Sequence, residues 1–190
     1  MNLIYDFETL SQNPDNGPIV SIAALVYDPD VEYDYSQLVN MAKYMKFDIA
    51  EQCKKYNRII DLDTVSWWQS LGAEAQKQII PRPSDVSITE LYNFFVDTLN
   101  GIEVKRVYTR GNDFDPIFLK SILKTIDKPF PYSWWKIRDT RSYIEGLSFG
   151  GKMGNSFIPE GLNDKIVLHN PIHDIALDVM RMQVLIKAIS

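Results

Sequence analysis

The sequence has a single cysteine, Cys53, among its 190 residues. One cysteine excludes an internal disulfide and a zinc site built from several cysteines, and it fits a reducing compartment. The chain also lacks an apolar run of membrane-spanning length and a basic N-terminal segment followed by a long apolar one. We therefore expect a soluble, unexported, cytoplasmic protein that makes no membrane contact.

An excess of positive charge is missing as well. The chain has 25 Asp and Glu residues against 20 Lys and Arg, which gives a formal net charge of -5. Proteins that coat long duplexes neutralise phosphates with clustered Lys and Arg, so this composition argues against that class. A pocket that grips a few phosphates through metal ions remains compatible.

What the sequence does have is enough apolar content, 45% of its residues, for one substantial core. Its length favours one domain over two, so we treat residues 1–190 as a single domain. Three strands are predicted first, at residues 3–10, 19–27 and 31–39. They would form an antiparallel meander, in which the last strand is more exposed.

Helices then alternate with single short strands. The clearest helix is predicted at 87–99, because Ser87 and Glu90 match a capping box and four apolar residues share one face. Further helices are predicted at 48–55, 65–71, 73–80, 116–126, 140–145 and 171–189, further strands at 104–108 and 133–137, and a mobile loop at 149–164. This order predicts an α/β fold with a mixed central sheet flanked by helices, in which residues at strand ends converge.

The first strand ends in two carboxylates, Asp6 and Glu8, with Phe7 between them. Residues two apart in a strand share a face and are separated by about 6 to 7 Å. Carboxylates that close repel each other unless a divalent cation lies between them. Acidic pairs with the same spacing occur elsewhere in the chain, but only this pair ends an apolar strand. We therefore predict a metal site here.

Two later segments carry further candidates. Asp115 follows a short strand and opens a helix, so it is either an ordinary helix-start carboxylate or a third acid at the same sheet edge. Near the C-terminus, His169 precedes the last helix and Asp174 lies one turn inside it, an arrangement that suits a general base beside a metal ligand. The alternative, that a histidine caps the helix or pairs with a surface acid, is favoured for His173.

Three motifs together resemble a known family: Asp-Phe-Glu-Thr at 6–9, Asn-Asp-Phe-Asp at 112–115, and His, four residues, then Asp at 169–174. They resemble the DEDDh branch of the DnaQ-like 3'-5' exonucleases, which have an RNase H-like fold, and in particular its phage exonuclease A (DexA-type) and RNase AS-like group. The segments 64–68, 110–115, 135–141 and 169–178 also look like that group, so the resemblance extends over most of the chain.

The resemblance implies a two-metal phosphodiesterase. Asp6, Glu8 and Asp174 would hold the metal ion that binds the attacking water, and Asp6 would bridge to a second ion. Asp115 would reach that second ion through water, and His169 would be the general base. Two Mg²⁺ or Mn²⁺ ions about 3.5 to 4 Å apart stabilise both the entering and the departing oxygen. Ligand sets made only of oxygen favour these cations over zinc.

The same resemblance places Thr9 and Leu10 beside the terminal nucleotide, with an apolar side chain wedged against its base. Trp67 or Trp68 would offer a face on which a base stacks, worth about 1 to 3 kcal/mol, and the other would be core. We take Trp68 as the candidate for stacking.

Three arginines, Arg110, Arg138 and Arg141, are candidates for phosphate contacts, Arg110 and Arg141 being the preferred ones. Each has the alternative of pairing with a neighbouring acid. The remaining aromatic residues of that region are expected in the core: Trp134, Trp135 and Tyr143.

The functional hypothesis is a metal-dependent exonuclease that releases nucleoside 5'-monophosphates from the 3' end of single-stranded DNA. The alternative is an exoribonuclease on short or tailed RNA, which would read the ribose 2'-OH. A third reading is a non-catalytic interaction module on the same fold, although such a module would be free to lose one of the five motif residues and none is missing. Many members of the family are dimers, so a homodimer is left open, and a phage-encoded protein would act in the host cytoplasm.

Overall fold

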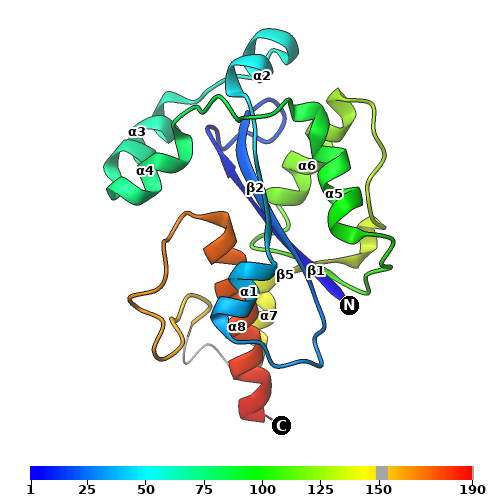
Figure 1. Ribbon diagram of the computed structural model, residues 1–190, viewed down its shortest axis with the longest axis vertical. Coiled ribbons are helices and arrows are strands. Elements are labelled where there is room, and N and C mark those ends of the chain that lie inside the picture. The colour runs from blue at the N-terminus through cyan, green and yellow to red at the C-terminus, as the bar shows by residue number, and fades with distance from the viewer. Residues whose placement is uncertain (149–153, 190) are drawn as a thin grey trace.

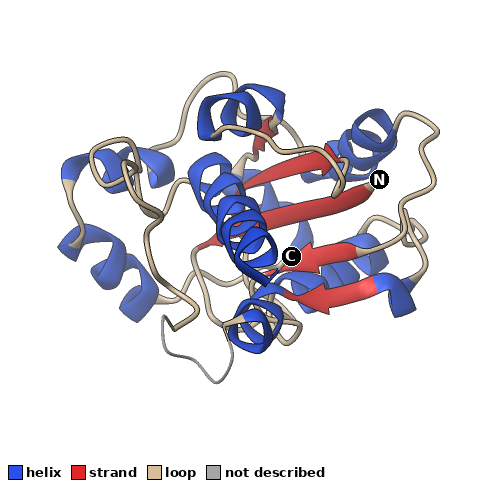
Figure 2. Cartoon of the chain, turned by 90° about the horizontal axis from the view of Figure 1, so that it is seen from below, coloured by secondary structure: helices blue, strands red, loops and turns tan. Residues whose placement is uncertain are grey.

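A mixed sheet of five strands forms the centre of the protein, whose computed structural model describes residues 1–148 and 154–189. The strand order is β3-β2-β1-β4-β5, with β1, β2 and β3 antiparallel and β4 and β5 parallel to β1. Helices lie on both faces of this sheet (Figure 2). The strands are β1 (Asn2–Thr9), β2 (Ile19–Tyr27), β3 (Lys43–Lys46), β4 (Val107–Thr109) and β5 (Ile137–Asp139).

Apart from α2, which lies at the top of Figure 1, the helices form three groups around the sheet. In Figure 1, α5 and α6 lie on one side, α1, α7 and α8 on the other, and α3 and α4 stand apart beyond the carboxyl end of β1. The helices are α1 (Tyr35–Met41), α2 (Ile49–Tyr56), α3 (Leu62–Ser70), α4 (Ala73–Ile79), α5 (Leu91–Leu99), α6 (Asp115–Thr125), α7 (Thr140–Leu147) and α8 (Pro171–Ile189), with short 3-10 turns η1 (Ile88–Glu90) and η2 (Trp134–Lys136). Within the described ranges, no helix is both long and apolar enough to cross a membrane.

Strand β1 separates two cores. Its residues Leu3, Tyr5 and Phe7 pack with the aromatic residues of α5 and α6, whereas Ile4 packs with residues of α8. Because side chains alternate between the two faces of a strand, Asp6 and Glu8 follow Ile4 and lie on the α8 face. The pattern of β1 therefore turns the two carboxylates toward the last helix of the chain.

The predicted strand at 31–39 is wrong. Part of this segment forms α1, because the carboxylate of Asp34 accepts a hydrogen bond from the Gln37 amide and the Gln37 side chain accepts one from the Asp34 amide, both at 2.8 Å. This reciprocal cap stabilises a helix start in a segment whose apolar alternation resembles a strand. The third antiparallel strand is instead β3, whose residues pair with Ser21 to Ala24 of β2.

The predicted helix at 87–99 forms, but without the predicted capping box. Ser87 accepts from the Thr89 amide, while the carboxylate of Glu90 accepts from the Asn93 side chain. The segment accordingly starts with the 3-10 turn η1 and becomes α-helical only from α5 onward.

The predicted strand at 133–137 begins later than expected, since η2 precedes β5. The prediction that Trp134, Trp135 and Tyr143 lie in the core is also wrong, as their exposed fractions are 70%, 63% and 36%. Trp134 and Trp135 belong to a turn in front of an edge strand of the sheet, which explains why they remain outside the core. Of the predicted loop at 149–164, residues 149–153 lie outside the described part, and residues 154–164 contain neither helix nor strand.

The loop between β1 and β2 is closely packed at Gly17. A Cβ atom at this position would lie 2.6 Å from the Ser11 Cβ and 2.7 Å from the Asn13 carbonyl oxygen. We expect Gly17→Ala to lower the free energy of unfolding by about 1 to 3 kcal/mol. Gly146, inside α7, has nothing within 4 Å of such a Cβ, so Gly146→Ala should raise it by about 0.5 to 1 kcal/mol. Urea unfolding of the two variants measures both changes, and equal effects would contradict this packing.

Candidate active site

Three carboxylates from the two ends of the chain meet at one place. Asp6 and Glu8 come from β1 and Asp174 from the first turn of α8, and each offers an oxygen within 4.8 Å of the others. Glu8 is buried, whereas Asp6 and Asp174 are half-buried. The structure thus brings together the residues expected to share a metal ion.

Asp115 approaches β1 from the edge that pairs with β4. Strand β4 pairs with β1 only at Leu3 and Ile4, so the Phe7 amide on that edge lies beyond the paired region. The Asp115 carboxylate accepts a hydrogen bond from this amide at 3.1 Å and is buried. Asp115 opens α6, as predicted, but it is not one of the three carboxylates within 4.8 Å of one another.

Burial and mutual repulsion govern the protonation of the cluster. Burial raises the pKa of Asp6 and Glu8 well above the ordinary value, and neighbouring carboxylates add to the rise, chiefly Asp115 for Asp6 and Asp174 for Glu8. Burial also raises the pKa of Asp115 and of Asp174 to about 7. An all-oxygen set whose charges repel at close range suits hard divalent cations such as Mg²⁺ and Mn²⁺, so the residues fit the implied metals.

His169 lies on the loop before α8, next to the tryptophans of α3. Its ring centroid is 4.9 Å from that of Trp67 and 6.1 Å from that of Trp68, both edge-on. Its backbone has a φ of 59°, in the left-handed region, and its amide donates a hydrogen bond to the Asp174 carboxylate. Burial lowers the pKa of the imidazole, which keeps it neutral near pH 7 and able to accept a proton.

His173 has a different environment. Its Nδ1 lies 2.8 Å from the Tyr35 hydroxyl of α1, and the Val167 amide donates to the same nitrogen at 3.4 Å. Neither the helix cap nor the surface acid that we expected is its partner. It nevertheless has a structural role, because it joins α8 to α1 and to the loop before α8.

The prediction that Trp68 stacks on substrate is wrong. Trp68 is 1% exposed and its Nε1 donates to the Thr9 carbonyl at 3.0 Å, so no ring face is free for a base. Trp67 is the exposed member of the pair, at 44%. Thr9 and Leu10, which we expected beside the terminal nucleotide, have partners inside the protein. The Thr9 hydroxyl donates to the Ser11 carbonyl, and Leu10 packs in a small core with Trp68.

The three arginines have different partners. Arg110 has the predicted alternative, a pair with an acid, since its Nη1 donates to Asp178 at 2.7 Å. Arg141 lies beside Gly111, and its charge lowers the pKa of Asp115, so it borders the acidic cluster. Arg138 donates to main-chain carbonyls at the sheet edge.

The residues that sequence reasoning missed lie behind Asp174. Asp178, Arg181 and Thr140 form a buried polar cluster with Arg110. Asp178 follows Asp174 by one helical turn, and Arg181 follows Asp178 by another. This spacing, and the family-like segments 135–141 and 169–178 that contain Thr140 and Asp178, were the signals in the sequence.

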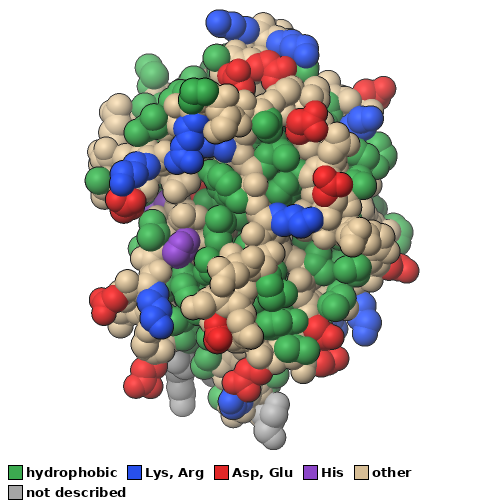
Figure 3. Space-filling model, in the orientation of Figure 1, with side chains coloured by type: hydrophobic (Ala, Val, Ile, Leu, Met, Phe, Trp, Pro, Cys, Tyr) green, Lys and Arg blue, Asp and Glu red, His purple; other side chains and the backbone are tan. Residues whose placement is uncertain are grey.

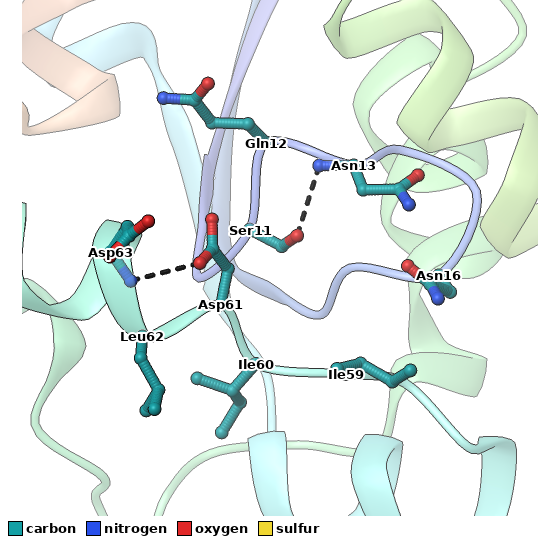
Figure 4. Close-up of a pocket in the computed structure, with 9 residues that line it drawn as sticks. All are labelled: Ser11, Gln12, Asn13, Asn16, Ile59, Ile60, Asp61, Leu62 and Asp63. Carbon is teal, nitrogen blue, oxygen red and sulfur yellow. Dashed lines mark hydrogen bonds between the residues drawn. The ribbon is translucent and has the colours of Figure 1, made fainter.

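Two hollows flank the site. Figure 3 shows histidine side chains in a hollow between the surface over α3 and α4 and the surface over the loop before α8. A second hollow of about 730 Å³ follows the end of β1 (Figure 4). It offers no Lys or Arg to a phosphate, since its walls are formed by Ser11, Gln12, Asn13, Asn16, Ile59, Ile60, Asp61, Leu62 and Asp63.

Comparison with known proteins places this chain in a family. The model of the 3'-5' exoribonuclease Rv2179c-like domain matches residues 1–184. An exodeoxyribonuclease of Enterobacteria phage T4 is 29% identical over 201 residues, which cover 96% of this chain and 87% of the phage protein.

Solved structures support the same fold. Escherichia coli exonuclease I in complex with a 5cy-dT13 oligonucleotide has a TM-score of 0.62 at 14% identity, covering 98% of this chain and 40% of that one. The zinc-bound form of its complex with single-stranded DNA has a TM-score of 0.60 at 15% identity, covering 98% and 39%. The chain therefore spans about 40% of the length of exonuclease I and shares its RNase H-like fold. Matched over nearly its whole length, the chain belongs to the Rv2179c-like family of DEDDh-type 3'-5' exonucleases.

Proposed function

We propose that this exonuclease acts on single-stranded DNA and releases nucleoside 5'-monophosphates from its 3' end. The observation that carries the proposal is the convergence of Asp6, Glu8 and Asp174 beside His169. DNA is favoured because the T4 relative, similar over nearly the whole chain, is named an exodeoxyribonuclease, and because the exonuclease I structures contain DNA. RNA is the second candidate, since the family model is named for an exoribonuclease.

In the proposed mechanism four carboxylates would hold two Mg²⁺ or Mn²⁺ ions. Asp6, Glu8 and Asp174 would serve one ion, and Asp6 and Asp115 the other. When bound, these ions stabilise negative charge on the entering and departing oxygens of the phosphodiester. The chain's own contribution is to fix the carboxylate oxygens of Asp6, Glu8 and Asp174 on two rigid elements, β1 and the start of α8.

His169 acts as the general base. Its neutral imidazole takes a proton from water as the water oxygen attacks phosphorus, and the bond to the 3' oxygen of the preceding nucleotide breaks. The nucleotide leaves as a 5'-monophosphate, and the departing 3' oxygen takes a proton from solvent water, which gives the shortened strand a new 3'-OH. The ring is held by Trp67 and Trp68, while the His169 amide donates to the Asp174 carboxylate. These contacts tie the base to a metal ligand.

Two properties beyond the chemistry also belong to this proposal. The protein acts in the cytoplasm, or in the host cytoplasm if a phage encodes it. The protein is either a monomer or a homodimer, which gel filtration with light scattering distinguishes.

The substrate proposal predicts stepwise shortening of 5'-labelled oligonucleotides from the 3' end, faster for DNA than for RNA of equal sequence. EDTA and Asp6→Ala should each abolish the reaction, the latter without unfolding the protein, because both remove metal binding. Asp30→Ala, on the exposed turn after β2, is the matched control and should cut normally. Activity that survives EDTA would refute the metal mechanism, and faster cutting of RNA would establish the alternative substrate.

For His169→Ala we expect a loss of about 10²- to 10⁴-fold in kcat, because proton transfer loses its acceptor. Mn²⁺ binding, measured by calorimetry, should persist, since the imidazole is not a proposed ligand. His173→Ala provides the comparison within the same segment and should reduce kcat far less. A near-normal kcat for His169→Ala would assign the base to another group.

The raised pKa values of Asp115 and Asp174 predict how metal binding and pH act on stability. A carboxyl whose pKa rises from 3.8 to about 7 on folding stabilises the folded state fully below about pH 4, and this stability is lost as the pH rises to about 7. A bound cation favours the ionised form and removes that loss. We therefore expect Mn²⁺ to raise the Tm more at about pH 8 than at about pH 5.5. Equal gains at both pH values would contradict the protonation of this cluster.

A further inference from the structure

A buried charged cluster behind the active site has no part in the chemistry described so far. Asp178 is 2% exposed and lies one turn after Asp174 on α8. Its Oδ1 accepts from Nη1 of Arg110 and from Nη1 of Arg181, both at 2.7 Å. Its Oδ2 accepts from the Thr140 hydroxyl at 2.5 Å. Both carboxylate oxygens are therefore satisfied by partners from three different segments.

The two guanidinium groups extend this cluster to a fourth segment. Nη2 of Arg110 donates to Ser156 Oγ at 2.8 Å and to the carbonyl and side-chain oxygens of Asn155. Arg181 donates from Nε to the Phe157 carbonyl at 2.7 Å and from Nη2 to the Ser156 carbonyl at 3.2 Å. The cluster thus connects the end of β4, the start of α7, the segment 155–157 and α8.

The cluster adjoins the metal ligands. Asp6, Arg110, Asp174 and Asp178 line one small cavity between β1 and α8. Asp174 and Asp178 are four residues apart on a helix, so their side chains lie on the same face. The charge of Asp174 raises the pKa of both carboxylates of β1, so these groups repel one another, and this repulsion favours separation of the first turn of α8 from the strand.

We propose that Arg110, Asp178 and Arg181 are positioning residues that hold Asp174 within ligand distance of Asp6 and Glu8. This inference rests on the proposed function, because it assumes that these carboxylates bind divalent cations. Arginine suits the role, since its planar fork donates in several fixed directions at once. Arg110 uses one arm for Asp178 and the other for Asn155 and Ser156, and so fixes α8 against two separate segments.

Electrostatics and positioning predict opposite effects for one substitution. Arg110→Gln removes a positive charge near the ligands, and on charge alone it would strengthen cation binding. If Arg110 positions Asp174, the same change weakens binding. Titration calorimetry with Mn²⁺ in the absence of substrate separates the two, and we expect binding weaker by about 10- to 100-fold, as for other groups that orient metal ligands.

Arg110→Lys gives a second test that keeps the charge. A lysine has no fork and cannot bond Asp178 and Ser156 together, so Mn²⁺ binding should again weaken. This variant decides the matter if Arg110→Gln does not fold, as judged by circular dichroism. The matched control is Lys187→Gln on α8, which breaks the exposed ion pair of Lys187 with Glu32, a residue that precedes α1. This variant should bind Mn²⁺ as the wild type does.

The outcomes distinguish this inference from the proposed function. If the wild type binds no Mn²⁺, or if Asp6→Ala binds it unchanged, the proposed metal site itself is overturned. If the wild type binds Mn²⁺, Asp6→Ala does not, and the folded Arg110 variants bind as tightly as the wild type or more tightly, only the positioning role is overturned. Weaker binding by both Arg110 variants, with Lys187→Gln unchanged, supports it.

Discussion

The repulsion between carboxylates that the fold holds together is the constraint on which the rest of the structure depends. Asp6 and Glu8 are fixed by the alternation of β1, and Asp174 faces them from the first turn of α8. Three like charges at this distance destabilise the fold unless protons or cations neutralise them. The same arrangement that weakens the metal-free protein therefore creates its affinity for divalent cations, and stability and function are coupled through one cluster.

The groups around the carboxylates reduce this destabilisation of the metal-free protein without removing it. The Phe7 amide and the charge of Arg141 lower the pKa of Asp115, and Arg110 and Arg181 lower that of Asp174, yet burial outweighs them in both cases. Full neutralisation by arginines would leave nothing for a cation to bind. The guanidinium groups instead bond to Asp178 and to the segment 155–157, and so connect that segment to α8.

The sequence predicted the parts of the site that depend on local pattern. Alternation in β1, the helix start at Asp115 and the loop before α8 are all readable within a few residues, and the three motifs add the family. Prediction failed where contacts distant in sequence decide the outcome. Trp68 is buried because its indole reaches the Thr9 carbonyl, 59 residues away, and Arg110 pairs with Asp178, 68 residues away. No spacing rule within one segment reports such contacts.

The burial of Trp68 connects His169, the proposed general base, to the strand that carries two of the acids. Trp68 bonds the last residue of β1 through its Nε1, and both tryptophans of α3 contact the His169 ring at their edges. The His169 amide in turn bonds the Asp174 carboxylate, which faces Glu8 on that same strand. These contacts form a closed path from β1 through α3 and His169 to α8 and back to β1. The proposed general base is thereby connected to the strand that carries two of the proposed metal ligands.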